Sequence, residues 1–189
     1  GVVGEASIRG AVEKGCSVTA VDLNEKKLES LREKYKGYES NLIFINTQEI
    51  SLDELIEDAD LVIGAVLVPG GKPPIIVSNS NIKSMEPGSV IVDVAIDQGG
   101  CVEDISATTH SKPFIERDGV KVLAIANLPG SVPDRASIAI SNQIEKYLPF
   151  YLNNNWIDSV HLNDTYGDSL QVHNGMLLSK PVSDSLGIA

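Results

Sequence analysis

Residues 89–96 read Ser89-Val90-Ile91-Val92-Asp93-Val94-Ala95-Ile96. This run is nearly all apolar and rich in β-branched residues, which predicts a strand that a parallel sheet buries on both faces. Asp97 follows directly. It therefore places a carboxylate at the carboxyl end of the strand, where open α/β sheets bind their ligands. The alternative is that residues 97–100 form only a tight loop, in which Asp97 accepts hydrogen bonds from its own backbone.

The first residues match the closing half of a dinucleotide-binding loop. Gly1-Val2-Val3-Gly4 precedes a helical stretch to about Lys14, and a short apolar strand then ends in Asp22. In this arrangement the glycines let the backbone approach a pyrophosphate, N–H groups at the helix start bind it, and the acid binds the adenosine ribose. Asp22 would repel a 2′-phosphate, which favours NAD over NADP. The alternative is ordinary helix packing at the glycines, with Asp22 a loop residue.

The motif begins inside its phosphate loop. The first glycine and the strand that leads into the loop are not in the sequence, and no Met opens the chain. We therefore expect a fragment of a longer protein, in which the first strand of the fold lies upstream.

Strand and helix patterns alternate regularly after Asp22. Apolar strands are predicted at residues 42–45, 60–66 and 120–126, with helices at 24–35 and 79–85 between them and a surface loop before residue 120. Such alternation predicts an α/β fold with a Rossmann-type, doubly wound parallel sheet. We assign residues 1–132 to this domain.

A different pattern begins at Pro133. One long helix is predicted from Pro133 to about Asn153, with an apolar stripe that includes Ile138 and Ile144. Asn174-Gly175 then predicts a hairpin with a type I′ turn. Because this segment is too small to fold alone, residues 133–189 are interpreted as a return into a second, catalytic and substrate-binding domain.

Composition excludes several classes of protein. Fifteen basic and 26 acidic residues give a net charge of −11, without the basic stripe that binds nucleic acid. No apolar run approaches the roughly 20 residues that span a bilayer. The two cysteines and three histidines have no metal-ligand spacing, so no metal site is predicted. A reduced, cytoplasmic setting is the default expectation.

Three stretches carry a family resemblance. Residues 60–70, 87–101 and 126–133 resemble the alanine dehydrogenases, and the likeness covers essentially the whole chain. Its most specific part is Ile96-Asp97-Gln98-Gly99-Gly100-Cys101, because the related transhydrogenase NAD domains carry a different sequence there. The resemblance implies a cytoplasmic, hexameric, NAD-dependent oxidoreductase that reversibly converts L-alanine to pyruvate and ammonium in L-alanine catabolism.

The resemblance also implies residue roles. Asp97 falls on the catalytic aspartate, which would handle protons as water adds to the iminopyruvate intermediate, together with a histidine of the other domain. The matching cofactor contacts are Gly1, Val2, Val3, Gly4, Asp22, Lys27, Thr47, Val66, Leu67, Val94, Ala95, Ile96, Asp97, Ile125, Ala126, Asn127 and Leu128.

Two departures from the family pattern limit these roles. The substrate-binding arginine, lysine and histidine belong to an N-terminal domain that this chain lacks, so the chain alone should not turn over alanine. The family often has Arg-Pro shortly after Gly-Gly-Cys, where this chain reads Ile105-Ser106-Ala107, which weakens one expected NAD contact. The alternatives are a transhydrogenase NAD domain, an opine-type amino-acid dehydrogenase and a non-catalytic NADH sensor.

Overall fold

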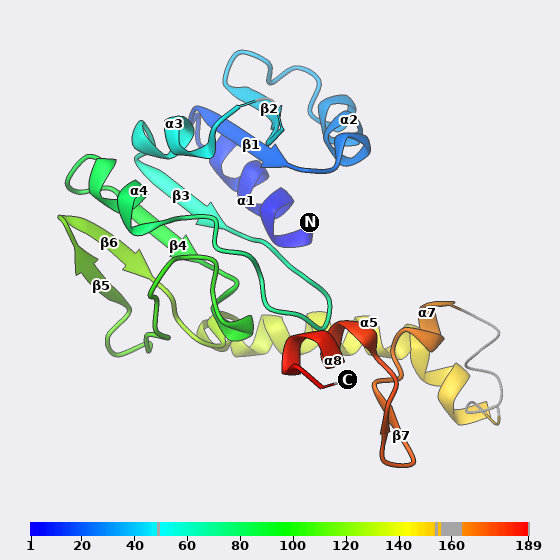
Figure 1. The fold of residues 1–189 in the computed structure, drawn as a ribbon. Helices are drawn as coiled ribbons and strands as arrows, with labels where there is room; N and C mark the ends of the chain where they lie inside the picture. Colours follow the sequence, from blue (N-terminus) through cyan, green and yellow to red (C-terminus); the bar gives the residue numbers. More distant parts are fainter. Residues whose placement is uncertain (49, 154, 156–163, 189) are drawn as a thin grey trace. The chain divides into compact units, whose positions relative to one another are not determined.

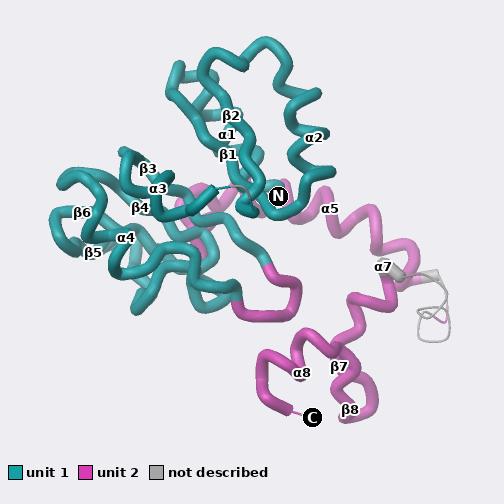
Figure 2. Tube along the Cα trace, turned by 45° about the horizontal axis from the view of Figure 1, so that its top comes forward, with its two compact units in different colours: residues 1–67, 73–126 teal, residues 68–72, 127–189 magenta. Residues whose placement is uncertain are grey.

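The computed structural model describes residues 1–48, 50–153, 155 and 164–188 (Figure 1). These residues form two compact units, shown in different colours in Figure 2. The first unit contains residues 1–67 and 73–126, and the second contains residues 68–72 and 127–189. The first unit therefore ends at Ala126, a few residues before the boundary expected after residue 132.

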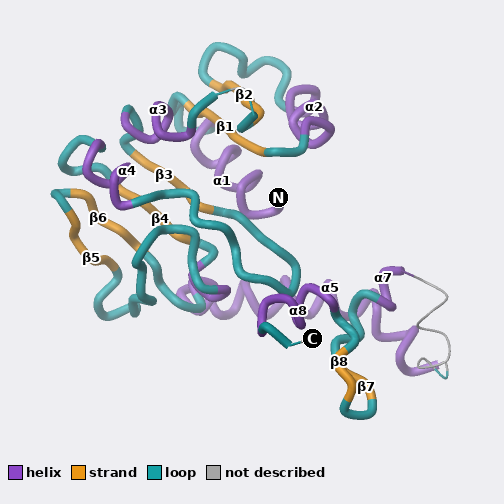
Figure 3. The backbone as a smooth tube through the Cα atoms, viewed as in Figure 1, coloured by secondary structure: helices purple, strands orange, loops and turns teal. Residues whose placement is uncertain are grey.

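The first unit alternates strands and helices along the chain (Figure 3). Its helices are α1 (Val2–Val12), α2 (Glu25–Lys34), α3 (Leu52–Glu57), α4 (Asn79–Ser84) and the short 3₁₀ helix η1 (Ile96–Gln98). Its strands are β1 (Val18–Asp22), β2 (Leu42–Asn46), β3 (Leu61–Gly64), β4 (Val90–Asp93), β5 (Phe114–Arg117) and β6 (Val120–Leu123).

The strands of the first unit form two sheets in the described residues. One pairs β1 with β2 in parallel, and the other has the order β3-β4-β6-β5, in which β3, β4 and β6 run parallel. Helix α1 packs against both β1 and β3 and so connects the two sheets. The expected α/β fold of Rossmann type is confirmed.

Two apolar clusters hold this unit together. The larger one contains Ile82 of α4, Ile91 of β4 and Val122 of β6, which are almost completely buried. The smaller one joins Val12 of α1 to Leu42 of β2. Both clusters bring residues from distant parts of the chain together, so they fix the strands whose ends carry the candidate site.

Three strands end earlier than predicted, and one strand was missed. The strand expected at residues 89–96 is β4, which ends at Asp93, because the Asp93 carboxylate accepts a hydrogen bond from Ala95 N at 2.9 Å and turns the chain. The predicted strands 60–66 and 120–126 likewise end at Gly64 and Leu123. The predicted surface loop before residue 120 contains β5, which pairs antiparallel with β6 at the sheet edge.

The second unit contains η2 (Leu128–Ser131), α5 (Pro133–Asn153), α7 (Asp164–Gly167), β7 (Val172–His173), β8 (Met176–Leu177) and α8 (Lys180–Leu186). The predicted hairpin is present, with positive φ at Asn174 and Gly175. The rings of Phe150 on α5 and Tyr166 on α7 stack with centroids 3.7 Å apart. The predicted apolar stripe of α5 is mostly exposed in the structure. Ile144, for example, is 55% exposed.

Candidate functional site at the carboxyl ends of the strands

The parallel register brings most of the predicted site residues to one edge of each sheet. Asp22 pairs with Asn46, which Thr47 follows, and Gly64 pairs with Asp93. The residues after β3, β4 and β6 therefore emerge side by side. In Figure 1, α1 begins beside the arrowhead ends of β1 and β3. The site thus has one group at β1, β2 and α1, and a second group at β3, β4 and β6.

The start of α1 presents backbone N–H groups at this edge. Gly1 is the N-cap, it contributes no side-chain hydrogen bond, and the first bond of the helix runs from Glu5 N to Gly1 O at 2.9 Å. The N–H groups of Val2, Val3 and Gly4 precede that bond, and helix N-termini of this kind attract anions. A Cβ on Gly4 would lie 4.0 Å from Ala65 Cβ, directly after β3. Gly4 therefore adjoins the second group.

Asp22 and Thr47 lie together at the ends of β1 and β2. Thr47 N donates to Asp22 O at 3.4 Å, and Asp22 Oδ1 accepts from Asn24 N at 2.8 Å. Among the described residues, Asp22 Oδ2 has no hydrogen-bond partner, and the buried Thr47 Oγ1 has none either. Buried hydroxyls without a partner are rare in native proteins. The Thr47 hydroxyl is therefore free to bind a polar group beside Asp22.

Helix α2 begins beside Asp22 and Thr47, and an ion pair and hydrogen bonds fix its first turn. Asn24 Oδ1 accepts from Lys27 N at 3.2 Å, which caps the helix and leaves the Lys27 side chain exposed. Glu25 pairs with Arg32 at 2.5 Å and accepts from Asn46 Nδ2 at 3.0 Å. The Arg32 guanidinium, and then the Asn46 amide, lower the pKa of the Glu25 carboxyl. An ionised Glu25 therefore ties the start of α2 to the end of β2.

In the second group, Asp97 stands on a short helix beyond β4. Val94 N donates to Gly64 O at 2.9 Å, which aligns the residues after β4 with those after β3. The chain then turns, and η1 carries Asp97 as an exposed residue while Ala95 and Ile96 are buried beneath it. After β3, Val66 is half-buried and the next residue, Leu67, is exposed. The carboxylate of Asp97 is thus accessible on a firmly packed turn.

The residues after β6 complete the second group only in part. Thr108 N donates to Ala124 O at 2.7 Å, and Ala126 N donates to Thr108 O at 3.4 Å, which holds Ile125 and Ala126 beside the loop at Thr108. Asn127, with a φ of 51°, and Leu128 are assigned to the second unit. All the other predicted contacts lie in the first unit.

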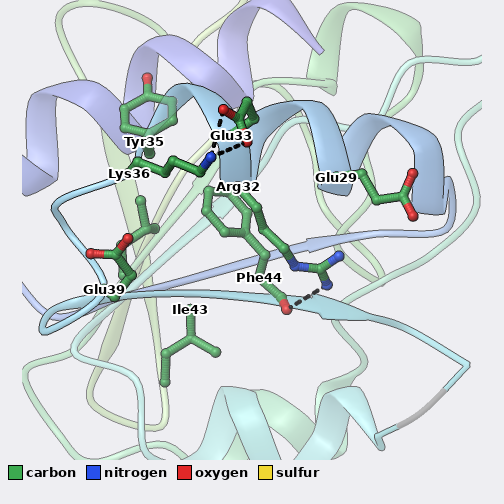
Figure 4. Close-up of a pocket in the computed structure, with 9 residues that line it drawn as sticks. Glu29, Arg32, Glu33, Tyr35, Lys36, Glu39, Ile43 and Phe44 are labelled. Carbon is green, nitrogen blue, oxygen red and sulfur yellow. Dashed lines mark hydrogen bonds and ion pairs between the residues drawn. The ribbon is translucent and has the colours of Figure 1, made fainter.

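The structure also has a surface hollow away from this edge (Figure 4). It lies between the last turns of α2 and the first residues of β2, including Leu42. Most of its charged side chains are engaged with one another or with the backbone: Lys36 pairs with Glu33 at 2.5 Å, and Arg32 donates to Phe44 O at 3.1 Å. We assign no function to this hollow, because it is open and most of its charged groups are already engaged within the chain.

Sequence reasoning missed two buried polar residues at the strand ends. Asp93 is 2% exposed and accepts backbone hydrogen bonds around the loop that carries Asp97. Thr108 Oγ1 accepts from Ala124 N at 3.2 Å and braces the end of β6. An acid inside an apolar strand was a visible signal for Asp93, whereas Thr108 had none.

The Cys101 thiol is buried beside Asp93, and we expect it to be chemically inert. Burial, then the charge of Asp93, raises the pKa of the thiol to about 12. Only on the order of one thiol in 10⁴ is then ionised at pH 8. Iodoacetamide at pH 8 should therefore modify the exposed Cys16 and leave Cys101 unmodified, as read by mass mapping of both peptides. Equal rates at the two cysteines would contradict this expectation.

In the described ranges, no group of three or more His, Cys, Asp or Glu side chains is placed to hold a metal ion; His161 lies outside these ranges. The helices that the structure describes include none with the length and apolarity to cross a membrane.

Comparison with known proteins identifies the family. The family model described as "Alanine dehydrogenase/PNT, C-terminal domain" matches residues 1–180. Alanine dehydrogenases of Halomonas elongata and Bacillus subtilis are 37% and 38% identical over 188 residues, covering 100% and 99% of this chain. The chain spans about half the length of these curated relatives, 50% and 49%.

Solved structures agree with the sequence comparison. An L-alanine dehydrogenase structure matches with a TM-score of 0.77 and 35% identity over 99% of this chain and 51% of the other. A transhydrogenase from Sinorhizobium meliloti shares the fold, with a TM-score of 0.59 and 24% identity over 87% of this chain and 42% of the other. The resemblance seen in the sequence is confirmed, and the chain belongs to the alanine dehydrogenase/PNT family as its C-terminal domain.

Proposed function

We propose that this chain supplies the NAD-binding part of an alanine dehydrogenase, which oxidises L-alanine with NAD and water to pyruvate, ammonium and NADH. The observation that carries the proposal is the buried hydroxyl of Thr47, which has no hydrogen-bond partner among the described residues and lies beside Asp22, at the edge where α1 begins. Family membership and the exposed Asp97 at the same type of strand end support it.

The residues at these strand ends offer a suitable contact to each part of a dinucleotide. The N–H groups of Val2 and Val3 would bind the pyrophosphate at the helix start. Asp22 Oδ2 would accept from a ribose hydroxyl, and Thr47 Oγ1 would gain a polar partner in the adenosine part. A carboxylate at Asp22 also favours NAD over its 2′-phosphorylated form. The run Val94 to Asp97 would face the nicotinamide end.

Asp97 would manage protons in the reaction. When bound, NAD would supply the acceptor for the hydride of the substrate carbon. The Asp97 carboxylate would accept a proton from the water that adds to the imine left after hydride loss, and would return it later to the departing nitrogen, as a general base and then a general acid. The residues that bind the substrate carboxylate would come from the part of the relatives that this chain does not match, so we expect no turnover by the chain alone. We further propose a hexameric, cytoplasmic enzyme.

The decisive experiment measures NAD reduction by the complete protein with L-alanine. Reduction that depends on L-alanine supports the proposal. NADH binding without alanine oxidation would overturn the substrate assignment. Turnover only with a second, keto-acid substrate would indicate an opine-type dehydrogenase, and no turnover with any amino acid would indicate an NADH sensor.

The Asp22→Asn variant tests the cofactor assignment. It keeps the shape of the side chain and removes the charge, so NAD affinity should fall by about 10- to 100-fold, the effect of losing a charged hydrogen-bond acceptor. Discrimination against NADP should fall as well. Fluorescence titration of NADH and NADPH measures both effects. Glu29→Gln on the exposed face of α2 removes the same charge and should leave both affinities unchanged. Wild-type NADH affinity in Asp22→Asn would refute the role of Asp22.

A further inference from the structure

Asp93 lies at the end of β4 and holds both ends of the loop that carries Asp97. Its side chain is 2% exposed. Oδ1 accepts from Ala95 N at 2.9 Å, where the loop begins. Oδ2 accepts from Cys101 N at 2.8 Å and Val102 N at 3.2 Å, where the loop ends. Asp97 stands between these two attachment points.

The loop also closes on itself and is fixed to the sheet. Gly100 N donates to Ala95 O at 3.1 Å, so the two ends of the loop meet above Asp93. Ile76 N and Val77 N both donate to Cys101 O, at 2.7 and 3.1 Å, which ties the returning chain to a neighbouring segment. The Asp93 carboxylate therefore sits at the centre of a closed turn whose outer end is η1.

The surrounding residues are shaped to admit this carboxylate. A Cβ on Gly100 would lie 2.8 Å from Asp93 Oδ2, and a Cβ on Gly64 would lie 2.4 Å from Cys101 Sγ. The Cys101 thiol, which is completely buried, donates to Asp93 Oδ1 at 3.4 Å. The two glycines leave room for the side chains, and three backbone N–H groups, of Ala95, Cys101 and Val102, point at the carboxylate. Together they form a cradle that a carboxylate fills.

We infer that Asp93 is a positioning residue for Asp97, whose buried carboxylate sets the path of the loop and so the place of the catalytic carboxylate. This inference rests on the proposed function. Asp93 itself touches neither substrate nor cofactor in this assignment. Its role follows from the donors: only an acceptor with two oxygens satisfies N–H groups at both ends of the loop, and buried donors left without an acceptor force the chain to move.

The test uses the Asp93→Asn variant of the complete protein. The amide keeps the size of the side chain but turns one acceptor into a donor that faces backbone N–H groups. We expect kcat for alanine oxidation to fall about 10- to 100-fold, because small displacements of a catalytic group have effects of this size. The KM for NAD and NADH affinity should stay within a few-fold of the wild type. Wild-type kcat in this variant would overturn the inference.

A double variant separates positioning from general damage. If Asp93 acts through Asp97, Asp93→Asn should lower kcat much less in an Asp97→Asn background than in the wild type. An equal fold-loss of kcat in both backgrounds would overturn the inference. Asn81→Ala is the matched control: Asn81 is a buried polar residue of α4 outside the site, hydrogen-bonded to Asp53 at 2.6 Å. Asn81→Ala should lower the melting temperature and leave kcat within a few-fold of the wild type.

A readout independent of activity keeps this inference distinct from the proposed function. Hydrogen exchange of the peptide that covers residues 94–102 should be faster in Asp93→Asn and unchanged in Asn81→Ala. Unchanged exchange would overturn the inference even if alanine oxidation proved not to be the reaction. If Asp93→Asn does not fold, Gly100→Ala provides a second test, because its methyl group displaces Asp93 Oδ2 while the side chain remains a carboxylate. The same loss of kcat with retained NADH binding is expected. Wild-type kcat in Gly100→Ala would overturn the inference.

Discussion

Replacement of Asp97 by asparagine is expected to lower kcat for L-alanine oxidation by the complete protein by about 10²- to 10⁴-fold. An amide has nearly the shape of the carboxylate but does not take a proton from water at neutral pH. Because Asp97 is exposed on η1, the change should cost little stability. NADH affinity should stay within a few-fold of the wild type. Steady-state NAD reduction and fluorescence titration of NADH measure the two quantities.

Gln98→Asn serves as the control for this prediction. Gln98 is the exposed neighbour of Asp97 on the same 3₁₀ turn, so the variant perturbs the same turn without removing the carboxylate. Its kcat should stay within a few-fold of the wild type. Equal losses in both variants would attribute the effect to the turn. Wild-type kcat in Asp97→Asn would remove Asp97 from the mechanism.

The second large effect is expected for the stability of Gly100→Ala. Gly100 has a φ of +81°, and its Cβ would stand 2.6 Å from Ile105 Cγ2 and 2.8 Å from Asp93 Oδ2. A left-handed backbone costs a non-glycine residue about 1–2 kcal/mol, and crowding of a packed interior costs typically about 1–3 kcal/mol more. The free energy of unfolding should fall accordingly, as measured by urea denaturation followed by circular dichroism.

Gly15→Ala separates the two causes. Gly15 has nearly the same φ, +78°, but a Cβ there would meet nothing within 4 Å. Only the backbone strain applies, so the free energy of unfolding of this variant should fall by about 1–2 kcal/mol. The difference between the two variants measures the crowding around Asp93. Equal losses would mean that the loop relaxes around the new methyl group and that the cradle is not tightly packed.

Local signals in the sequence predicted several elements well. Asn24 was placed at the start of a helix, and its side chain caps α2 in the structure. Asn174-Gly175 forms the expected turn between β7 and β8. Such signals work because the capping and turn geometries depend on a few neighbouring residues. The apolar runs also located the parallel strands, although Ile43 of β2 and Leu61 of β3 are exposed in the structure.

Strand ends and the edge strand depended on partners that are distant in sequence. Strand β5 alternates weakly and was read as loop, but pairing with β6 makes it a strand. The run from Ser89 to Ile96 is apolar throughout, yet β4 ends at Asp93 because the Asp93 carboxylate captures N–H groups from both sides of the following loop. A hydrogen-bond acceptor within an apolar run was visible, but its donors were not.

The sequence by itself determined the α/β class, the order of its elements and the side chains available at each strand end, because hydrophobic period and turn chemistry are local. Only the tertiary structure decided which of those side chains meet. Parallel pairing placed Thr47 beside Asp22, and folding of the loop over Asp93 placed Asp97 on an exposed turn. These arrangements arise from contacts between residues far apart in the chain, whose energies no local stretch contains.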